Sequence, residues 1–253
     1  MMSVIARHHE ALALLRETMG AVREDAAVMP FGIADMDERL ADGGLALDGL
    51  HEVSAATPTL TDDAAATLFA VGIAARAAQA NGRRVLWALT RFDLYAPGLE
   101  QAGLDPATLL FVEAREDKDV LAVMEDGLRH GSLAAVVGEV KRADMVATRR
   151  LQLAAMTGKT PALLSRRWRR QGICPLAELS AAMTRWRIAS APSARLPAAG
   201  VGRARWTVEL ARQRGGPPFT LELDACDDTG RLALPAVPRD RAPAAAGAAA
   251  RAA

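Results

Sequence analysis

The chain has 253 residues, of which 51% are hydrophobic, and its formal net charge is +1, which suits one large α/β domain with or without appendages. No run of about 18 uncharged apolar residues occurs, and His8, His9 and Glu10 stand where a signal peptide needs its apolar centre, so we expect a cytoplasmic protein without a membrane span. The two cysteines, Cys174 and Cys226, lie far apart without a C-x-x-C spacing, which excludes a disulfide framework or a thiolate zinc site and predicts two core residues.

The small net charge conceals an uneven distribution of charge along the chain. Residues 1–140 contain 11 Lys and Arg against 22 Asp and Glu, a net charge of −11, whereas residues 141–253 contain 20 against 8, a net charge of +12. Two interpretations stay open. The basic part meets nucleic acid or an acidic protein face, or the two parts neutralise each other within one domain.

An amphipathic pattern opens the chain. Residues 3–22 carry apolar side chains at alternating spacings of three and four, which predicts a helix within an N-terminal segment, residues 1–24, ahead of the main domain. This helix either packs on its own core or docks on a neighbouring subunit or partner. His8 and His9 point in different directions on such a helix, so no metal site is expected there. The stripe consists of Ile5, Leu12, Leu15, Met19 and Val22.

Strand and helix patterns then alternate between residues 30 and 167. A short helix near residues 36–44 precedes the first strand, and another follows near residues 97–105. The predicted strands cover residues 50–54, 83–89, 108–114, 133–140 and 160–167. The longer predicted helices cover residues 62–80, 117–131 and 144–157. This alternation predicts a doubly wound, mostly parallel sheet.

The pattern changes after residue 180. Residues 183–190, 203–216 and 218–224 alternate apolar and polar side chains around a Gly-Gly-Pro turn, which predicts antiparallel strands at one sheet edge. The following Ala/Pro-rich sequence is too poor in large apolar groups to fold alone. We therefore expect a core over residues 30–225 and a disordered tail over residues 226–253.

The succession of segments resembles a known family. The order "DERLADGGLALDGLHEVSA", "RRVLWALTRFDLYAPGLEQAGLD", "LAAVVGEV", "TPALLSR" and "RWTVELARQRGGPPFTLELD" is similar to the RecA fold, and most closely to its ImuA family of bacterial damage-inducible mutagenesis accessory proteins. The resemblance covers about residues 30–225. It implies a RecA-like α/β core, and it implies partners: ImuB, a polymerase-like protein, and an error-prone replicative-type DNA polymerase that copies damaged DNA in the SOS response. RecA and a second copy of the chain are further candidate partners.

The segment after the first core strand has the layout of a phosphate-binding P-loop without its chemistry. A P-loop needs glycines, a lysine and a Ser/Thr, and this interval has neither glycine nor lysine. We expect Thr61 to cap the following helix, which places two aspartates in the first turn, where they repel a phosphate. The degenerate positions are Ser54, Ala55, Ala56, Pro58, Asp62 and Asp63.

The metal-binding motifs of the resemblance are altered as well. Gly138 stands where the RecA pattern has the aspartate that organises Mg²⁺, and Glu139 follows it. Thr90 and Arg91 stand nearest to the position of the catalytic glutamate. If the match to the RecA pattern is shifted along the chain, Glu139 or Asp93 could take one of the metal-binding positions. No such shift places a lysine in the P-loop. We therefore expect no ATPase activity, no bound cofactor and no metal.

Two basic segments follow the ends of central strands, on the edge where RecA-like proteins contact DNA. Trp168 lies among four arginines and is a candidate for base stacking. The opposing interpretation is that these cations are solvated or contact the acidic part of the chain. The predicted nucleic-acid contacts are Lys141, Arg142, Arg149, Arg150, Arg166, Arg167, Trp168, Arg169 and Arg170.

Together these patterns favour a non-catalytic RecA-like scaffold of a translesion-synthesis complex. Its partner contacts are expected at Ile5, Leu12, Leu15 and Met19. Two other functions stay open: a cell-division inhibitor like SulA, and an ATP-binding RecA-like recombination factor. The long N-terminal helix and the tail favour the scaffold.

Overall fold

The computed structural model describes residues 27–169, 172–193 and 200–235. The strands are β1 (Val28–Met29), β2 (Leu45–Ala46), β3 (Leu50–Ala55), β4 (Val85–Leu89), β5 (Leu109–Glu113), β6 (Ala135–Val140), β7 (Ala162–Arg166), β8 (Thr184–Ala191), β9 (Arg205–Gln213) and β10 (Phe219–Asp224). The helices are α2 (Ala34–Asp37), α3 (Leu60–Asn81), α4 (Ala96–Gln101), α5 (Asp117–His130) and α6 (Met145–Gly158), with 3₁₀ turns η1 (Pro106–Thr108) and η2 (Pro175–Ala177).

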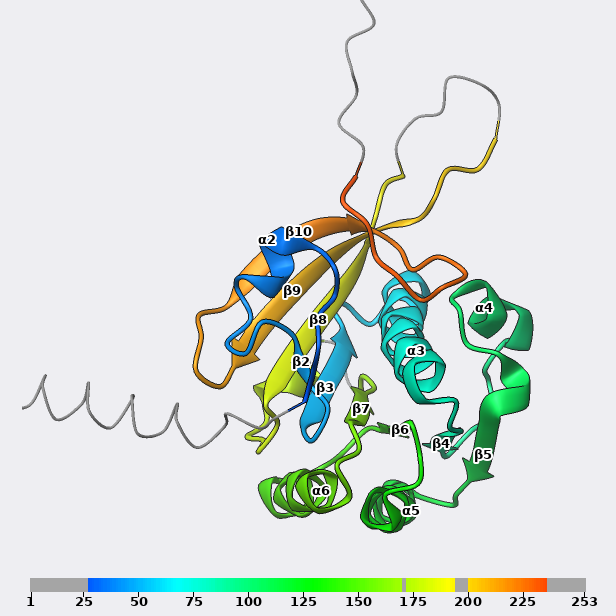
Figure 1. Ribbon diagram of the computed structural model, residues 1–253, viewed down its shortest axis with the longest axis vertical. Helices are drawn as coiled ribbons and strands as arrows, with labels where there is room; N and C mark the ends of the chain where they lie inside the picture. The colour runs from blue at the N-terminus through cyan, green and yellow to red at the C-terminus, as the bar shows by residue number, and fades with distance from the viewer. Residues whose placement is uncertain (1–26, 170–171, 194–199, 236–253) are drawn as a thin grey trace, which may run out of the picture.

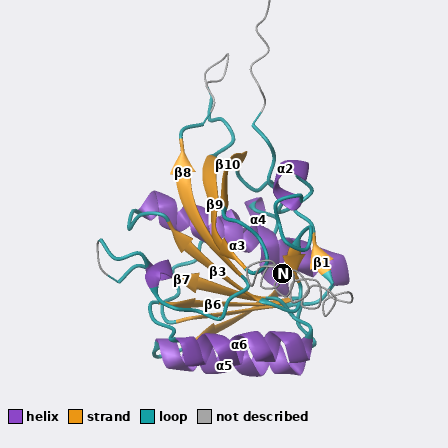
Figure 2. Ribbon diagram, turned by 90° about the vertical axis from the view of Figure 1, so that its left-hand side faces the viewer, coloured by secondary structure: helices purple, strands orange, loops and turns teal. Residues whose placement is uncertain are grey.

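Eight strands form one twisted sheet between two helical layers (Figures 1 and 2). Their order is β10-β9-β8-β3-β7-β6-β4-β5, and every pair from β8 to β5 is parallel. Strands β9 and β10 complete the sheet in antiparallel pairing. The predicted mostly parallel α/β sheet with antiparallel edge strands is thus confirmed, with one correction: residues 183–190 form a strand parallel to β3, and only its outer neighbour runs the other way.

Two apolar cores cover the two faces of the sheet. Helix α3 packs on one face, with α4 beside it, and α5 and α6 pack on the other (Figure 1). On the α3 face, the ring of Phe69 lies 5.5 Å from Trp186 and 6.2 Å from Phe31. Phe31 belongs to the segment before β3, where α2 and the β1–β2 pair cover strands β8 to β10. The sequence did not predict the β1–β2 pair, whose strands are only two residues long.

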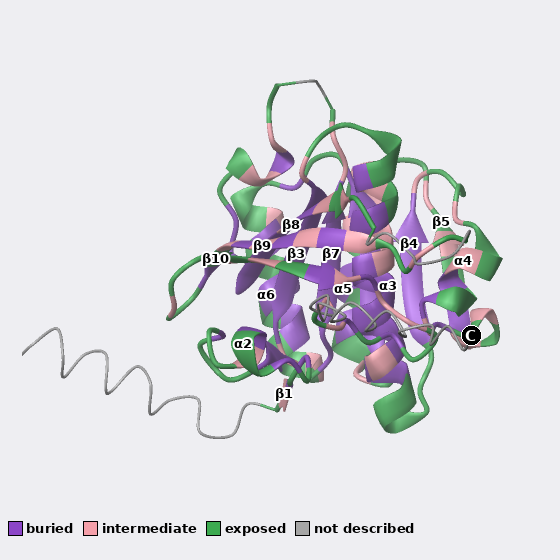
Figure 3. Cartoon of the chain, turned by 90° about the horizontal axis from the view of Figure 1, so that it is seen from above, coloured by how far each residue is buried: buried purple, intermediate pink, exposed green. Residues whose placement is uncertain are grey.

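Helix α3 is buried on most of its surface, as its apolar composition predicts, and the central strands are buried with it (Figure 3). It ends at Gly82, whose φ of 65° is the left-handed conformation that favours glycine, and the Gly82 N–H donates to the Ala78 carbonyl oxygen (2.8 Å). The predicted end of this helix near residue 80 is therefore confirmed.

The chain remains part of the packed body beyond residue 225, so the predicted start of the tail is wrong. Leu232 is buried in the α3-side core, and Ala233 forms an antiparallel bridge with Asp224. Two glycines permit this path, since a Cβ built on Gly103 would lie 2.4 Å from the backbone nitrogen of Gly230. The amino-acid composition did not predict this packing, because a few buried contacts and close backbone approaches hold the segment in place. The predictions for residues 1–24 and 236–253 fall outside the described residues.

Cys226 is half-buried and packs against the α3-side core, whereas Cys174 is half-buried at the surface beyond β7. Burial raises the pKa of the Cys226 thiol to about 12. We expect Cys226 to resist alkylation at pH 8 in the folded protein, because the reactive species is the thiolate. Mass spectrometry after iodoacetamide treatment measures this. Modification of Cys226 as fast as in urea-unfolded protein would contradict the burial.

In the part of the chain that the structure describes, no helix has the length and apolarity needed to cross a bilayer. The same residues contain no group of three or more His, Cys, Asp or Glu side chains arranged to hold a metal ion.

Candidate functional site

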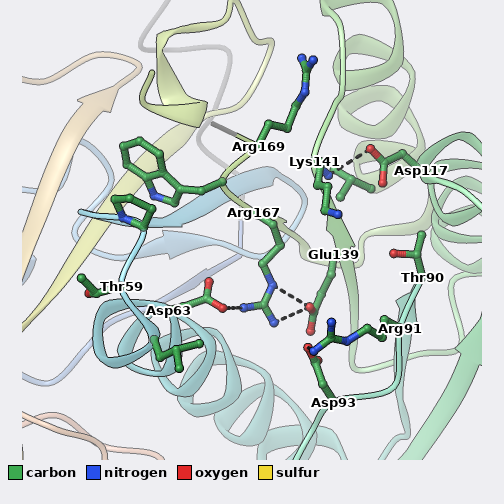
Figure 4. Close-up of a pocket in the computed structure, with 14 residues that line it drawn as sticks. Thr59, Asp63, Thr90, Arg91, Asp93, Asp117, Glu139, Lys141, Arg167 and Arg169 are labelled. Carbon is green, nitrogen blue, oxygen red and sulfur yellow. Dashed lines mark hydrogen bonds and ion pairs between the residues drawn. The ribbon is translucent and has the colours of Figure 1, made fainter. Parts of the chain in front are cut away.

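The carboxyl ends of the parallel strands β3, β4, β6 and β7 meet around a pocket of about 390 Å³ (Figure 4). This is the edge at which open α/β sheets generally bind ligands. The pocket is lined by Pro58, Thr59, Leu60, Asp63, Thr90, Arg91, Asp93, Asp117, Glu139, Val140, Lys141, Arg167, Trp168 and Arg169. Four acidic and four basic side chains thus face the same small volume.

The loop between β3 and α3 is shorter than the sequence predicts. Strand β3 continues to Ala55 and α3 begins at Leu60. The helix cap is Thr59. Its backbone is extended, and its side-chain oxygen accepts a hydrogen bond from the Asp62 N–H (3.4 Å). The prediction that Thr61 caps the helix is wrong, because Thr61 lies inside the first turn, although both aspartates do belong to that turn.

The Asp62 carboxylate forms hydrogen bonds with the loop between β3 and α3, in the place that a phosphate would occupy in a working P-loop. It accepts hydrogen bonds from the Thr57 N–H (3.1 Å) and the Thr57 hydroxyl (2.6 Å), and from the Ser190 N–H (2.8 Å). The Ala56 N–H donates to the Ile188 carbonyl oxygen (2.8 Å), and Pro58 has no N–H. The protein therefore uses its own oxygen atoms to satisfy loop N–H groups at residues 56 and 57.

Asp63, one residue further, faces the pocket and meets Arg167. The Arg167 guanidinium pairs with the Asp63 carboxylate and also donates from Nε (2.8 Å) and Nη2 (2.5 Å) to Glu139 Oε2 (Figure 4). The Trp87 indole N–H donates to the other Glu139 oxygen (2.8 Å). We call Asp63, Arg167 and Glu139 the pocket triad. It joins the start of α3 to the ends of β6 and β7 across the pocket.

The electrostatics of the pocket triad favour a permanently charged arginine. Burial disfavours the guanidinium, but Glu139 and Asp63 outweigh it and raise the pKa of Arg167 above its usual value. The stabilisation from this group is complete below the ordinary pKa of arginine and is lost only as pH rises through the folded-state pKa. At neutral pH Arg167 is therefore charged.

Gly138 does not face the pocket, so its predicted place at the metal position is wrong. A Cβ built on Gly138 would lie 2.1 Å from the Met124 sulfur of α5, on the opposite face of the sheet. Because side chains alternate along a strand, Glu139 points to the pocket. Glu139 is bound by Arg167, and Asp93 lies 3.5 Å from Arg91 in a largely exposed pair.

Replacing Gly138 with alanine should lower the free energy of unfolding by about 1–3 kcal/mol, because the added methyl group overpacks the buried Met124 contact. Urea denaturation of the purified variant measures this. Gly98→Ala is the control. Its Cβ would lie 3.3 Å from the Tyr95 ring, a close contact that this exposed side chain can relieve by a small shift, so the variant should not lose more than about 0.5 kcal/mol of stability. Equal stability of both variants would show that β6 and α5 are loosely packed.

The predicted nucleic-acid contacts separate into two groups. Lys141, Arg142, Arg149 and Arg169 are exposed. Arg150 pairs with Glu125 of α5 (2.5 Å), and Arg167 belongs to the pocket triad. Arg166 and Trp168 are held by contacts within the fold, and Arg170 lies outside the described residues.

The side chains of Arg166 and Trp168 are bound by other groups of the protein, which the basic sequence does not reveal. The Arg166 side chain is completely buried and pairs with Glu52 (2.8 Å) and Glu178 (2.5 Å). The Trp168 indole donates to the Ala55 carbonyl oxygen (3.0 Å) and packs against the α3-side core. Arg166 therefore presents no face to a strand of DNA, whereas Trp168 is half-buried in the wall of the pocket.

Sequence reasoning missed Glu52, which lies in the middle of β3 and is fully buried between two arginines. Its carboxylate pairs with Arg166 Nη1 (2.8 Å) and with Arg185 Nε (2.6 Å). The available signal was a charged residue inside an apolar strand, which requires a buried partner of opposite charge. We call Glu52, Arg166 and Arg185 the sheet triad.

No protein-family model matches the chain. The chain is 39% identical, over 201 residues, to the curated proteins named Protein ImuA from two strains of Caulobacter vibrioides. Each match covers 78% of this chain and 82% of the relative. At this identity and coverage, the chain belongs to the ImuA family.

Proposed function

We propose that the protein is a non-catalytic, RecA-like scaffold of a bacterial translesion-synthesis complex that acts in DNA damage tolerance and induced mutagenesis. Family membership supports the role in mutagenesis. The observation that carries the non-catalytic part is the pocket triad, in which Arg167 binds Asp63 and Glu139 inside the pocket. A pocket already neutralised by its own side chains offers little to a triphosphate.

The arrangement around β3 supports the RecA-like assignment. Strand β3 is central, lies between β7 and β8, and leads through a short loop into α3. This is the strand, loop and helix order of a P-loop. The frame persists while the groups that bind phosphate are replaced by Pro58, Asp62 and Asp63.

The absence of a suitably placed lysine supports the same proposal. Lys141 is the one lysine among the residues that line the pocket. It follows β6, whereas the lysine of a P-loop stands at the start of the helix after the loop. Lys141 is exposed, and its backbone N–H donates to Asp117 (3.1 Å). It therefore belongs to the rim of the pocket.

Co-purification tests the scaffold. We expect the full-length chain to retain an ImuB-like polymerase-related protein and, through it, an error-prone replicative-type DNA polymerase. Removal of residues 1–24 should weaken this retention, and Arg91→Ala, an exposed change at the pocket rim, should not. Failure of the full-length chain to retain either partner, together with retention of a cell-division protein, would favour the SulA-like alternative.

Direct contact with DNA is a second proposal, carried by the exposed cations around the pocket. Lys141 and Arg169 both line it and are solvent-exposed. The double variant Lys141→Ala/Arg169→Ala should bind single-stranded DNA more weakly and show a slope against log[salt] that is shallower by about 1–2. Arg84→Ala, exposed before β4 at the opposite edge of the sheet, is the control. Salt-independent binding by the unaltered chain would reject the proposal.

A further inference from the structure

Helix α6 exposes four apolar side chains that form one flank. Met145, Val146, Leu153 and Met156 are 41%, 68%, 54% and 52% exposed. At 3.6 residues per turn, they fall within an arc of about 100° on the helix. An apolar stripe of this width is typical of a helix surface that packs against another element, and here it lies on an outer layer. We call these four residues the α6 flank.

The neighbours of α6 occupy other sides of the helix. Leu151 and Gln152 are buried against the sheet. Arg150 pairs with Glu125 and so marks the side that faces α5. Figure 1 shows α5 on one side of α6 only. The α6 flank therefore has no cover among the described residues.

The first described residues bring the N-terminal segment close to α6. The Ala27 carbonyl oxygen accepts the Leu47 N–H (2.8 Å), and three residues later the Leu50 N–H donates to the Gln152 side chain of α6 (2.9 Å). The five Cα–Cα steps from residue 22 to residue 27 span up to about 18 Å. The stripe of the predicted helix can thus reach α6 without any rearrangement of the fold.

The two apolar patterns match in spacing. On α6, positions 146, 149, 153 and 156 alternate spacings of three and four, with Arg149 as the polar member. In the predicted helix, positions 5, 8, 12, 15, 19 and 22 do the same, with His8 as the polar member. Such stripes pack together along a seam of two helices. A helix of 20 residues is about 30 Å long and α6, with 14 residues, about 21 Å, so the stripe covers the whole flank.

From this match we infer that the helix predicted for residues 3–22 packs on the α6 flank of its own chain. The inference does not depend on the proposed scaffold function. It has a consequence for any partner that binds Ile5, Leu12, Leu15 and Met19: the partner must displace this stripe from α6. Binding to the N-terminal segment would then expose the α6 flank in the same event.

Disulfide trapping tests the inference. Leu15→Cys is combined in turn with Val146→Cys, Leu153→Cys and Met156→Cys, in a background in which Cys174 and Cys226 are changed to alanine, and mild oxidation follows at low protein concentration. We expect an intramolecular disulfide in at least one pair. Leu15→Cys with Asp126→Cys, exposed on α5, is the control and should stay reduced. Covalent dimers alone, which would indicate docking on a second copy, or no disulfide in any of the three pairs, would overturn the inference.

Limited proteolysis gives a second readout without engineered cysteines. Trypsin cleavage after Arg16 and Arg23 should become at least tenfold faster in Leu153→Glu, because a charge on the flank releases the segment. Ala122→Glu, at an exposed position of α5, should leave the rate unchanged. An unchanged rate in Leu153→Glu would also overturn the inference.

Discussion

Glu52→Gln should lower the free energy of unfolding by about 3–5 kcal/mol. The substitution keeps the shape of the side chain and removes its charge. Arg166 and Arg185 then remain buried with side-chain exposures of 0% and 7% and without the carboxylate that both contact. Arg166 keeps only the partly exposed Glu178 as an ionic partner. A buried charge that loses a buried partner is among the few causes of destabilisation of this size.

Urea denaturation by circular dichroism, with linear extrapolation to water, measures the change. Glu209→Gln is the matched control, because Glu209 also pairs with an arginine, Arg187, but both partners are about one-third exposed. It should change stability by less than about 1 kcal/mol. Similar effects of the two substitutions would mean that the sheet triad is hydrated and contributes no more than a surface pair.

Arg167→Met should lower the free energy of unfolding by about 2–4 kcal/mol, because it leaves Asp63 and Glu139 facing one pocket without their cation. The methionine keeps much of the aliphatic stem, so the change is mainly electrostatic. Adding Glu139→Gln to Arg167→Met should recover about half of the loss, since glutamine still accepts the Trp87 N–H and removes one of the two like charges.

The measurement is the same denaturation experiment, arranged as a double-mutant cycle. Arg91→Met is the control from the same pocket, because Arg91 is 83% exposed and lies 3.5 Å from Asp93. It should change stability by less than about 1 kcal/mol. Strict additivity of Arg167→Met and Glu139→Gln would contradict a coupled pocket triad.

Periodicity was enough to predict the central part of the fold. The continuous apolar run at residues 133–140 became the fully buried strand β6, and helices α3, α5 and α6 begin and end within about two residues of their expected limits. These elements are determined by local patterns of apolar side chains. Parallel pairing of β8 was not predictable in the same way, because alternating strands occur in both orientations.

The sequence predicted which phosphate-binding groups the site lacks, but not which side-chain contacts replace them. The missing glycine and lysine could be read from the sequence, but the partner of Asp63 could not, since Arg167 is 104 residues away. Arg166 and Arg167 are neighbours in a basic run, yet one is buried with Glu52 and the other lies in the pocket. Alternation of side chains at the end of a strand separates them, and only the sheet order shows what each one meets.

Titration of the purified full-length chain with ATP and Mg²⁺ by isothermal calorimetry tests the self-filled pocket most directly. The pocket triad and the Asp62 loop contacts predict no saturable binding at nucleotide concentrations up to about 1 mM, an affinity weaker than about −4.1 kcal/mol. Saturable binding at micromolar concentrations, lost when Asp63 or Arg167 is substituted, would show that these side chains receive a nucleotide and would contradict a non-catalytic scaffold.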